Sequence, residues 1–295
     1  MRNLSYIAVT IEHAIAISII TLICRQAQSQ SEIPFRLVNG NLIVVTMTSG
    51  GTRHFDFVLD TGADTTIVDS RLAARLSKVE LRHVEQSTLA GVQSLSVSSV
   101  AVLSAGSAQV RNLQVLVQDL ARLRLLDSHI QGILGQDFLS HFNYLLDYRR
   151  HVIRIEAANE IEDALEGDRI KIEAVENRMI VASEGQSLRR AKLRLLLDSG
   201  ASLLVLIRKG AQALDVPALG SVQEITSSGS VSLPKGRVQM LTVGSQEFHN
   251  IDAVLSAVEP TEQIGDGLLP TTLFDTLYVN NRDGFVVLNP RVRKD

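Results

Sequence analysis

Hydrophobic and polar positions alternate in short runs along most of the chain, which is the pattern of half-buried β-strands. Gly, Ser and Asn separate these runs, as expected at turns. The predicted strands are 42–45, 55–59, 97–103, 113–117 and 151–155 in the first half, and 179–182, 193–197, 238–243, 251–255 and 284–288 in the second. Helical spacing is confined to 69–76 and 208–214, with one further turn at 138–142. The pattern predicts an all-β protein with a few short helices.

Two of the predicted strands are apolar on both faces. They end in Phe57-Val58-Leu59 and Leu195-Leu196-Leu197, and an aspartate follows each of them, Asp60 and Asp198. A strand with two apolar faces is buried on both sides. Each aspartate is therefore expected to emerge from the core at the end of a rigid element, which is a favourable place for a functional side chain.

The two aspartates belong to an internal repeat. The sequence around Asp60 is F-D-F-V-L-D-T-G-A-D, and the sequence around Asp198 is L-R-L-L-L-D-S-G-A-S. The same offset matches Leu76 with Leu214, Gly91 with Gly229, and Gly106 with Gly244. After a small slip, Gly132-Ile133-Leu134-Gly135 matches Gly267-Leu268-Leu269-Pro270. A register held over so many residues indicates a duplication.

The repeat is too long for a solenoid, so each copy is expected to form a lobe with its own core. Residues 156–171 are highly charged and lose the alternation, which is typical of a linker. The predicted organisation is an N-terminal lobe at 31–157, a linker at 158–167 and a C-terminal lobe at 168–295. The two lobes in one chain predict a monomer.

Residues 1–29 differ from the rest of the chain. The segment contains Arg2 near its start, an apolar run from Ala14 to Cys24, and the small residues of Ala27-Gln28-Ser29. This is the pattern of a secretory signal peptide cleaved after Ser29, and it predicts an exported protein, periplasmic or secreted. A retained N-terminal membrane anchor is the alternative.

Composition excludes several classes of function. The net charge is -3, and no basic, aromatic-rich stretch is suited to nucleic acid. The only cysteine is Cys24, and the seven histidines lack the spacing of metal ligands. We therefore expect no metal, no cofactor and no nucleic-acid partner.

The motif after each buried strand suits an acidic active-site loop. Gly62 and Gly200 permit a close backbone approach, because no Cβ is in the way, and their amides can bond the preceding carboxylate. Thr61 and Ser199 can bond backbone groups across the lobe junction and hold the two loops together. A single Asp-Thr-Gly is a common turn, but two copies in duplicated lobes would meet at the axis that relates them.

Two carboxyl groups in contact share one proton, since both cannot ionise at that distance. Such a pair can hold a water molecule between them. One carboxylate then takes a proton from the water while the other group protonates the carbonyl oxygen of a peptide bond. Hydrolysis by this route needs no covalent enzyme intermediate.

At these residues the chain resembles the pepsin–retropepsin family of aspartic peptidases. Asp60-Thr61-Gly62-Ala63-Asp64 is similar to the retroviral form of the motif, and Ile133-Leu134-Gly135 to the element that supports the catalytic loop. The resemblance extends over nearly the whole chain after residue 35. It implies a bilobal acid-protease fold with two β-barrel-like lobes and a peptide or unfolded-protein substrate in the cleft between them. Asp60 and Asp198 would be catalytic.

The chain also departs from the larger members of that family. Pro270 replaces the glycine of the second supporting element, and neither 88–97 nor 226–231 contains the flap tyrosine. Each copy is short, so the chain resembles two fused retropepsin-like copies, as in bacterial aspartyl proteases. Gly91 and Gly229 are expected on mobile flaps that contact substrate, or else simply in hairpin turns.

Neighbouring residues refine the prediction. Ala63 and Ala201 cannot donate a hydrogen bond to the carboxylates, so we expect activity at weakly acidic to neutral pH. Asp64 is expected to pair with an arginine or to cap a turn, and Asp137 and Asp147 to serve in turns or ion pairs. Two other functions stay open: a non-catalytic peptide-binding protein that retains the cleft, and a structural β-protein whose aspartates stabilise turns.

Overall fold

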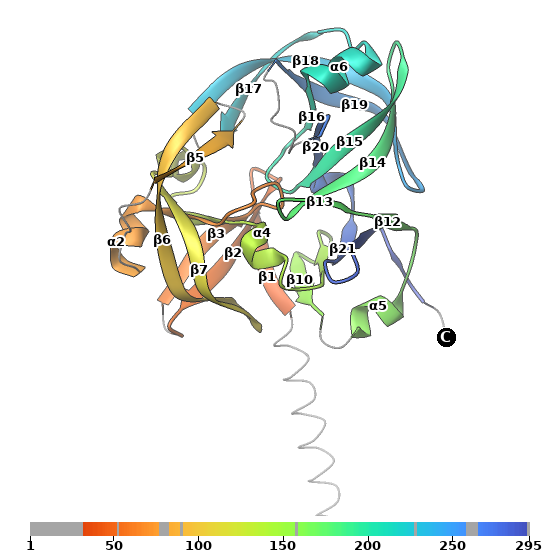
Figure 1. The fold of residues 1–295 in the computed structure, drawn as a ribbon. Coiled ribbons are helices and arrows are strands. Elements are labelled where there is room, and N and C mark those ends of the chain that lie inside the picture. Colours follow the sequence, from red (N-terminus) through yellow and green to blue (C-terminus); the bar gives the residue numbers. More distant parts are fainter. Residues whose placement is uncertain are drawn as a thin grey trace, which may run out of the picture.

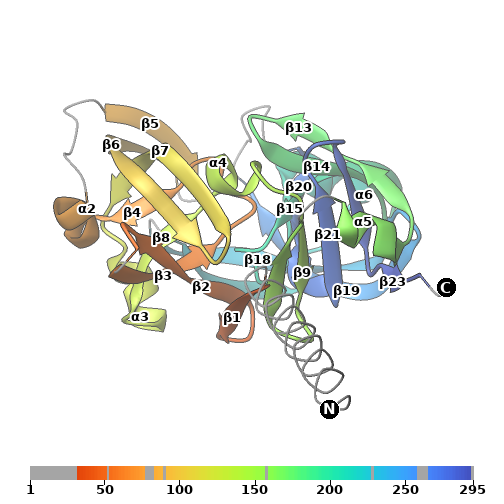
Figure 2. The same ribbon diagram turned by 90° about the horizontal axis from the view of Figure 1, so that it is seen from below.

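A computed structural model describes residues 32–51, 53–76, 83–88, 91–156, 159–226, 229–257 and 265–293. Two β-rich lobes lie side by side, one formed by each half of the chain (Figures 1 and 2). The all-β bilobal fold predicted from the repeat is therefore confirmed. The segment predicted as a signal peptide or anchor, 1–29, lies outside the described residues.

The first lobe is a closed barrel of six strands in the order β2-β3-β8-β4-β7-β6, and a pairing of β6 with β2 completes the ring. The strands are Leu42–Ser49, Arg53–Leu59, Ile130–Leu134, Ile67–Asp69, Ala108–Gln118 and Gly91–Ala105. One further strand, β5 (His83–Thr88), forms a hairpin with β6. Inside this ring β8 runs parallel to β3 and antiparallel to β4.

The second lobe repeats the arrangement with strands in the order β14-β15-β20-β16-β19-β18, closed by β18 pairing with β14. The strands are Arg178–Gln186, Arg190–Asp198, Gly267–Pro270, Leu204–Ile207, Gln246–Ser256 and Gly229–Val243. Here β17 (Gly220–Thr226) forms the hairpin with β18, and β13 (Glu173–Val175) pairs with β14. All the strands predicted in the barrels fall inside observed strands.

A central sheet joins the two lobes. Its strands run in the order β12-β22-β21-β9-β10-β1, at Arg169–Lys171, Phe285–Leu288, Thr276–Asn280, Tyr144–Asp147, Val152–Ile155 and Glu32–Val38. The lobes meet where β9 pairs with β21, with Leu146 opposite Leu277. One short ladder, β11 (Leu165–Glu166) with β23 (Arg291–Val292), lies apart from this sheet.

The helices are short. Those predicted from the repeat are confirmed as α2 (Ser70–Leu76) and α6 (Arg208–Leu214). The turn expected at 138–142 begins two residues earlier, as α4 (Gln136–Leu139). Two helices were not expected, α3 (Ala121–Leu126) and α5 (Glu160–Ala164), and the second of them lies in the predicted linker; η1 (Thr271–Leu273) is a single 3₁₀ turn. Among the described residues, no helix has both the length and the apolar character needed to cross a membrane.

The apolar core is shared between the lobes. The largest cluster of buried apolar residues includes Ile43 and Leu103 of the first barrel and Leu195 and Leu241 of the second. As predicted, each lobe also has an apolar cluster of its own, around Val58 in the first and Leu196 in the second, but the largest cluster crosses the lobe boundary. The two halves are consequently held in a defined relation, which matters for any site that draws on both.

Candidate active site

Each of the two predicted aspartates stands at the end of a buried central strand. Asp60 directly follows β3, and Asp198 is the last residue of β15. Parallel neighbours flank both strands, β8 beside β3 and β20 beside β15. The flanking strands bury the apolar residues that precede each aspartate, and the chain then turns outward toward the other lobe.

Four hydrogen bonds lock the two loops together across the lobe boundary. The Thr61 N–H donates to Ser199 Oγ at 3.0 Å, and Ser199 Oγ donates to the Leu59 carbonyl at 2.8 Å. Reciprocally, the Ser199 N–H donates to Thr61 Oγ1 at 3.0 Å, and Thr61 Oγ1 donates to the Leu197 carbonyl at 2.8 Å. Both hydroxyl residues are fully buried. The predicted bonding across the junction is therefore present, and it is reciprocal.

The two carboxyl groups meet between these loops, close enough for the negative charge of Asp60 to raise the pKa of Asp198. Each also accepts two backbone N–H groups of its own loop. Asp60 Oδ1 is 2.9 Å from the Gly62 nitrogen and 3.1 Å from that of Ala63. Asp198 Oδ1 has equivalent partners, the nitrogens of residues 200 and 201, at 2.7 and 3.1 Å.

The glycines make this approach possible. A Cβ added to Gly62 would lie 2.6 Å from Asp198 Cγ, and one added to Gly200 would lie 3.0 Å from Asp60 Cγ. Real Cβ atoms almost never approach other atoms as closely as 2.6 Å, and a contact at 3.0 Å is tighter than most. Each glycine therefore leaves the space that the carboxyl group of the opposite lobe occupies.

The environment raises the pKa of both carboxyl groups. Burial is the largest cause for Asp60, and it is partly offset by the N–H donors of Gly62 and Ala63. The pKa of Asp198 lies well above its ordinary value, because burial and then the negative charge of Asp60 disfavour its ionised form. The pair is thus arranged to carry one proton.

The element predicted to support the first loop does so through its backbone. The Leu134 carbonyl accepts the Asp60 N–H at 3.0 Å, and the Gln136 N–H donates to the Ala63 carbonyl at 2.8 Å. A Cβ on Gly135 would lie 2.7 Å from the carbonyl carbon of Thr65, so the strand can pass this close only with a glycine. The fully buried Gln136, which sequence reasoning missed, also donates its side-chain amide to the Thr61 carbonyl at 3.1 Å.

The second supporting element differs, as Pro270 suggested. Pro270 lies opposite Asp198 in the parallel pairing of β15 with β20. The next residue, Thr271, is fully buried, and its Oγ1 lies 2.5 Å from the hydroxyl of Tyr148 in the first half of the chain. The support of the second loop thus includes a side chain from the other half, a contact that the repeat could not indicate.

The neighbouring aspartates have structural partners. Asp64 pairs with an arginine, as predicted: its Oδ1 lies 3.3 Å from Nη2 of Arg178, a residue of the second lobe. Asp137 accepts the Thr66 N–H at 2.9 Å and the Thr66 hydroxyl at 2.6 Å, which fixes the end of the loop. Asp147 accepts the backbone N–H of residue 150 at 2.9 Å, in the turn between β9 and β10.

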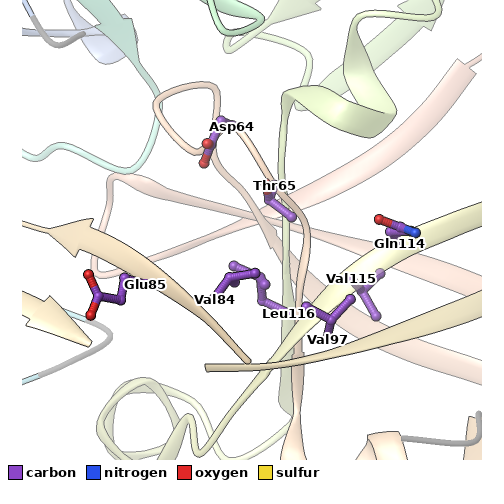
Figure 3. A pocket seen from close by; sticks show the side chains of 8 residues that line it. All are labelled: Asp64, Thr65, Val84, Glu85, Val97, Gln114, Val115 and Leu116. Carbon is purple, nitrogen blue, oxygen red and sulfur yellow. The ribbon is translucent and has the colours of Figure 1, made fainter. Parts of the chain in front are cut away.

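A pocket of about 210 Å³ opens beside the first loop, between it and the hairpin of β5 and β6. Its lining is divided between valine and leucine side chains and polar ones (Figure 3). The lining residues are Asp64, Thr65, Val84, Glu85, Val97, Gln114, Val115 and Leu116. Two of these residues, Asp64 and Thr65, belong to the loop that follows Asp60.

The two predicted flap glycines lie in hairpins, one in each lobe. Gly91 pairs with Thr88 at the end of the β5–β6 hairpin, and Gly229 pairs with Thr226 at the end of the β17–β18 hairpin. The positions are equivalent in the two lobes. Their contact with substrate stays a prediction.

Comparison with known proteins identifies the family. A family model described as aspartyl protease matches residues 45–138 and, separately, 184–272. No curated protein matches the chain. The two matched regions correspond to the two barrels, each with its Asp-Thr/Ser-Gly loop, and together they cover more than half of the chain. The chain belongs to the aspartyl protease family, as two retropepsin-like copies fused in one polypeptide.

Proposed function

We propose that the chain is an aspartic endopeptidase whose catalytic residues are Asp60 and Asp198. The observation that carries the proposal is the close approach of two carboxyl groups, one from each lobe, in loops locked together by Thr61 and Ser199. A structural β-protein would not be expected to bring two carboxyl groups together, because this arrangement costs free energy.

In the proposed reaction a water molecule sits between the carboxyl groups and attacks the carbonyl carbon of a peptide bond. The ionised carboxylate takes a proton from the water, and the protonated group gives its proton to the carbonyl oxygen. In the resulting tetrahedral diol, the group that took the water's proton gives it to the peptide nitrogen while the other carboxylate takes a proton from one diol hydroxyl. The C–N bond then breaks, and the pair again holds one proton. The Gly62 and Ala63 amides keep one carboxylate oriented throughout, so little reorganisation is needed.

The direct test is cleavage of unfolded casein or a peptide library by the purified chain. Asp60→Asn and Asp198→Asn should each lower kcat/KM by roughly 10²–10⁴-fold or more, because each removes one partner of the proton transfer. Asp163→Asn is a suitable control, because Asp163 is exposed in α5, away from the loops. A statine-type inhibitor should block cleavage by the wild type.

The outcomes separate the possible functions. Cleavage that depends on both aspartates supports the proposal. Binding of the inhibitor without any cleavage would support a non-catalytic peptide-binding protein instead. If the chain neither binds the inhibitor nor cleaves peptides, only a structural role would be left.

The pH dependence follows from the pKa directions. Activity requires one carboxylate to be ionised and the other to be protonated, so kcat/KM should form a bell between the two pKa values of the pair. Burial raises both pKa values, and the alanines at 63 and 201 have no hydroxyl to oppose it. We propose a maximum at weakly acidic to neutral pH; a maximum near about pH 2–3 would contradict this.

We further propose that residues 1–29 direct export of the peptidase. The apolar run and the small residues before Gln30 support cleavage after Ser29. Sequencing the N-terminus of the protein recovered from outside the cytoplasm should find Gln30 first. A retained N-terminus in the membrane fraction would indicate an anchor.

A further inference from the structure

Arg178 crosses the lobe boundary to reach the first catalytic loop. It is the first residue of β14, in the second lobe, and is only 8% exposed. Its Nε lies 3.3 Å from the carbonyl oxygen of Gly62, and its Nη2 lies 3.3 Å from Asp64 Oδ1. A third contact joins Nη1 to Glu176 at 3.4 Å. A buried cation is thus held against the loop that carries Asp60.

The contact with Gly62 leads directly to the Asp60 carboxylate. The carbonyl of Gly62 and the N–H of Ala63 belong to the same peptide group, and that N–H donates to Asp60 Oδ1 at 3.1 Å. A donor on the oxygen of a peptide group polarises it and strengthens the bond given by its N–H. Arg178 therefore acts on Asp60 twice, through its charge and through this peptide group.

The first lobe presents a different residue at the equivalent position. The pairing of Val44 with Val58 corresponds to that of Ile180 with Leu196, two residues before each aspartate, so Leu42 occupies the position equivalent to Arg178. A leucine side chain can donate no hydrogen bond and has no charge. The counterpart of Asp64 is likewise a neutral residue, Ser202. The symmetry of the duplicated site is broken at this contact.

Other ionisable groups face the contact from the surrounding elements. They are Asp60, Asp64 and Asp137 of the first lobe, Tyr148 after β9, and Glu176 and Asp198 of the second lobe. Asp64 and Glu176 partly neutralise the guanidinium. Burial raises the pKa of Asp60, and the Arg178 charge opposes that rise; for Asp198, burial and the Asp60 charge act in the same direction.

We propose that Arg178 is a positioning residue that keeps the shared proton on Asp198 and leaves Asp60 as the carboxylate that takes the proton from water. This inference rests on the proposed peptidase function. Asp198 then protonates the carbonyl oxygen in the first step, so that after attack the proton resides on Asp60 and Asp198 is ionised. The two aspartates therefore have different, fixed roles in a duplicated site, because the second lobe places the Arg178 cation beside the loop of the first.

The test is the pH profile of kcat/KM for a chromogenic peptide in four proteins: wild type, Arg178→Gln, Arg178→Lys and Asp64→Asn. The acidic limb reports ionisation of Asp60. Arg178→Gln should move that limb to higher pH. At a pH on the limb, kcat/KM divided by its plateau value should be at least about twofold smaller for Arg178→Gln than for the wild type. Arg178→Lys, which retains a charge, should stay closer to the wild type.

Asp64→Asn should move the limb in the opposite direction, because it removes a negative charge that offsets Arg178. This opposite sign separates electrostatics from disruption of the loop, which would lower the plateau in both variants. Arg237→Gln serves as the matched control, since Arg237 pairs with Asp252 on an exposed part of β18 and β19. Its limb should coincide with that of the wild type.

Infrared titration of the buried protonated carboxyl group provides a readout that needs no turnover. The midpoint of this titration should differ between the wild type and Arg178→Gln. If Arg178→Gln does not fold, the wild type is compared with Asp64→Asn. Limbs and midpoints that stay unchanged, or that move the same way in Arg178→Gln and Asp64→Asn, would overturn the inference. A wild type that hydrolyses no peptide would refute the proposed function instead, while the infrared comparison would still decide the effect of Arg178.

Discussion

Removing the Ser199 hydroxyl tests whether the interlocked loops hold the two lobes together. Ser199→Ala deletes a single oxygen atom that makes two buried hydrogen bonds, with the Thr61 N–H and the Leu59 carbonyl. Both partners belong to the other lobe, and both Thr61 and Ser199 are fully buried. The alanine leaves a donor and an acceptor without partners at the lobe boundary.

The magnitude follows from those two groups. A buried polar group deprived of its partner costs about 1–3 kcal/mol, so two of them should lower the free energy of unfolding by about 2–6 kcal/mol. That is a large share of the stability of a typical domain. Thr61→Val should have a similar effect, because it leaves the Ser199 N–H and the Leu197 carbonyl without their hydrogen-bond partner, the Thr61 hydroxyl.

Urea unfolding followed by circular dichroism measures the change, and the midpoint should fall by roughly 1 M or more. Thr61→Ser keeps the hydroxyl and should lose much less stability than Thr61→Val. Ser99→Ala is the matched control: Ser99 is exposed on β6, and its loss should change the free energy by less than about 0.5 kcal/mol. A loss for Ser199→Ala no greater than that of this control would refute the reasoning.

Three further predictions concern the carboxyl pair and the pocket. Gly62→Ala should lower kcat/KM by about 100-fold or more, since the new Cβ would lie 2.6 Å from Asp198 Cγ and push the carboxyl groups apart; an active alanine variant would contradict this. Asp198→Asn should gain thermal stability relative to the wild type as pH rises from about 4 to 7. Folding raises the pKa of Asp198, so the stabilisation from its protonated form is fully present below the unfolded pKa and is lost as pH rises through the folded pKa. Melting curves that keep the same separation across that range would count against it. Val97→Phe should fill the pocket of Figure 3 and reduce the preference for leucine over alanine in the adjoining substrate position by about tenfold; an unchanged ratio of kcat/KM for the two peptides would show that the pocket does not receive that side chain.

The two Asp-Thr/Ser-Gly loops could be located from the sequence because their signals are local. Buried strands appear as continuous apolar runs, and Asp60 and Asp198 directly follow two such runs in the sequence. Duplication then implied that two such loops meet at one axis. The same local logic placed the helices α2 and α6 within one residue of their observed ends, and it placed the barrel strands inside observed strands that are several residues longer.

Residues that act across the lobe boundary could not be located in this way. The contact of Arg178 with Gly62 and that of Tyr148 with Thr271 join segments far apart in the sequence, and both depart from the repeat. The one available signal for Arg178 was its place at the start of a buried strand, where the other copy has a leucine. A charged residue there needs a partner, but its identity depends on how the lobes pack.

The sequence alone determined that the protein has two similar β-rich halves and that each presents one aspartate after a buried strand, because alternation, turn residues and repetition act over short distances along the chain. Only the tertiary structure decided how the halves are joined: a central sheet in which β9 pairs with β21, a core shared by both lobes, and a cation from one lobe beside the carboxylate of the other. These features depend on the relative placement of the two copies. That placement follows from the burial of surfaces distributed over the whole chain, and no short segment encodes it.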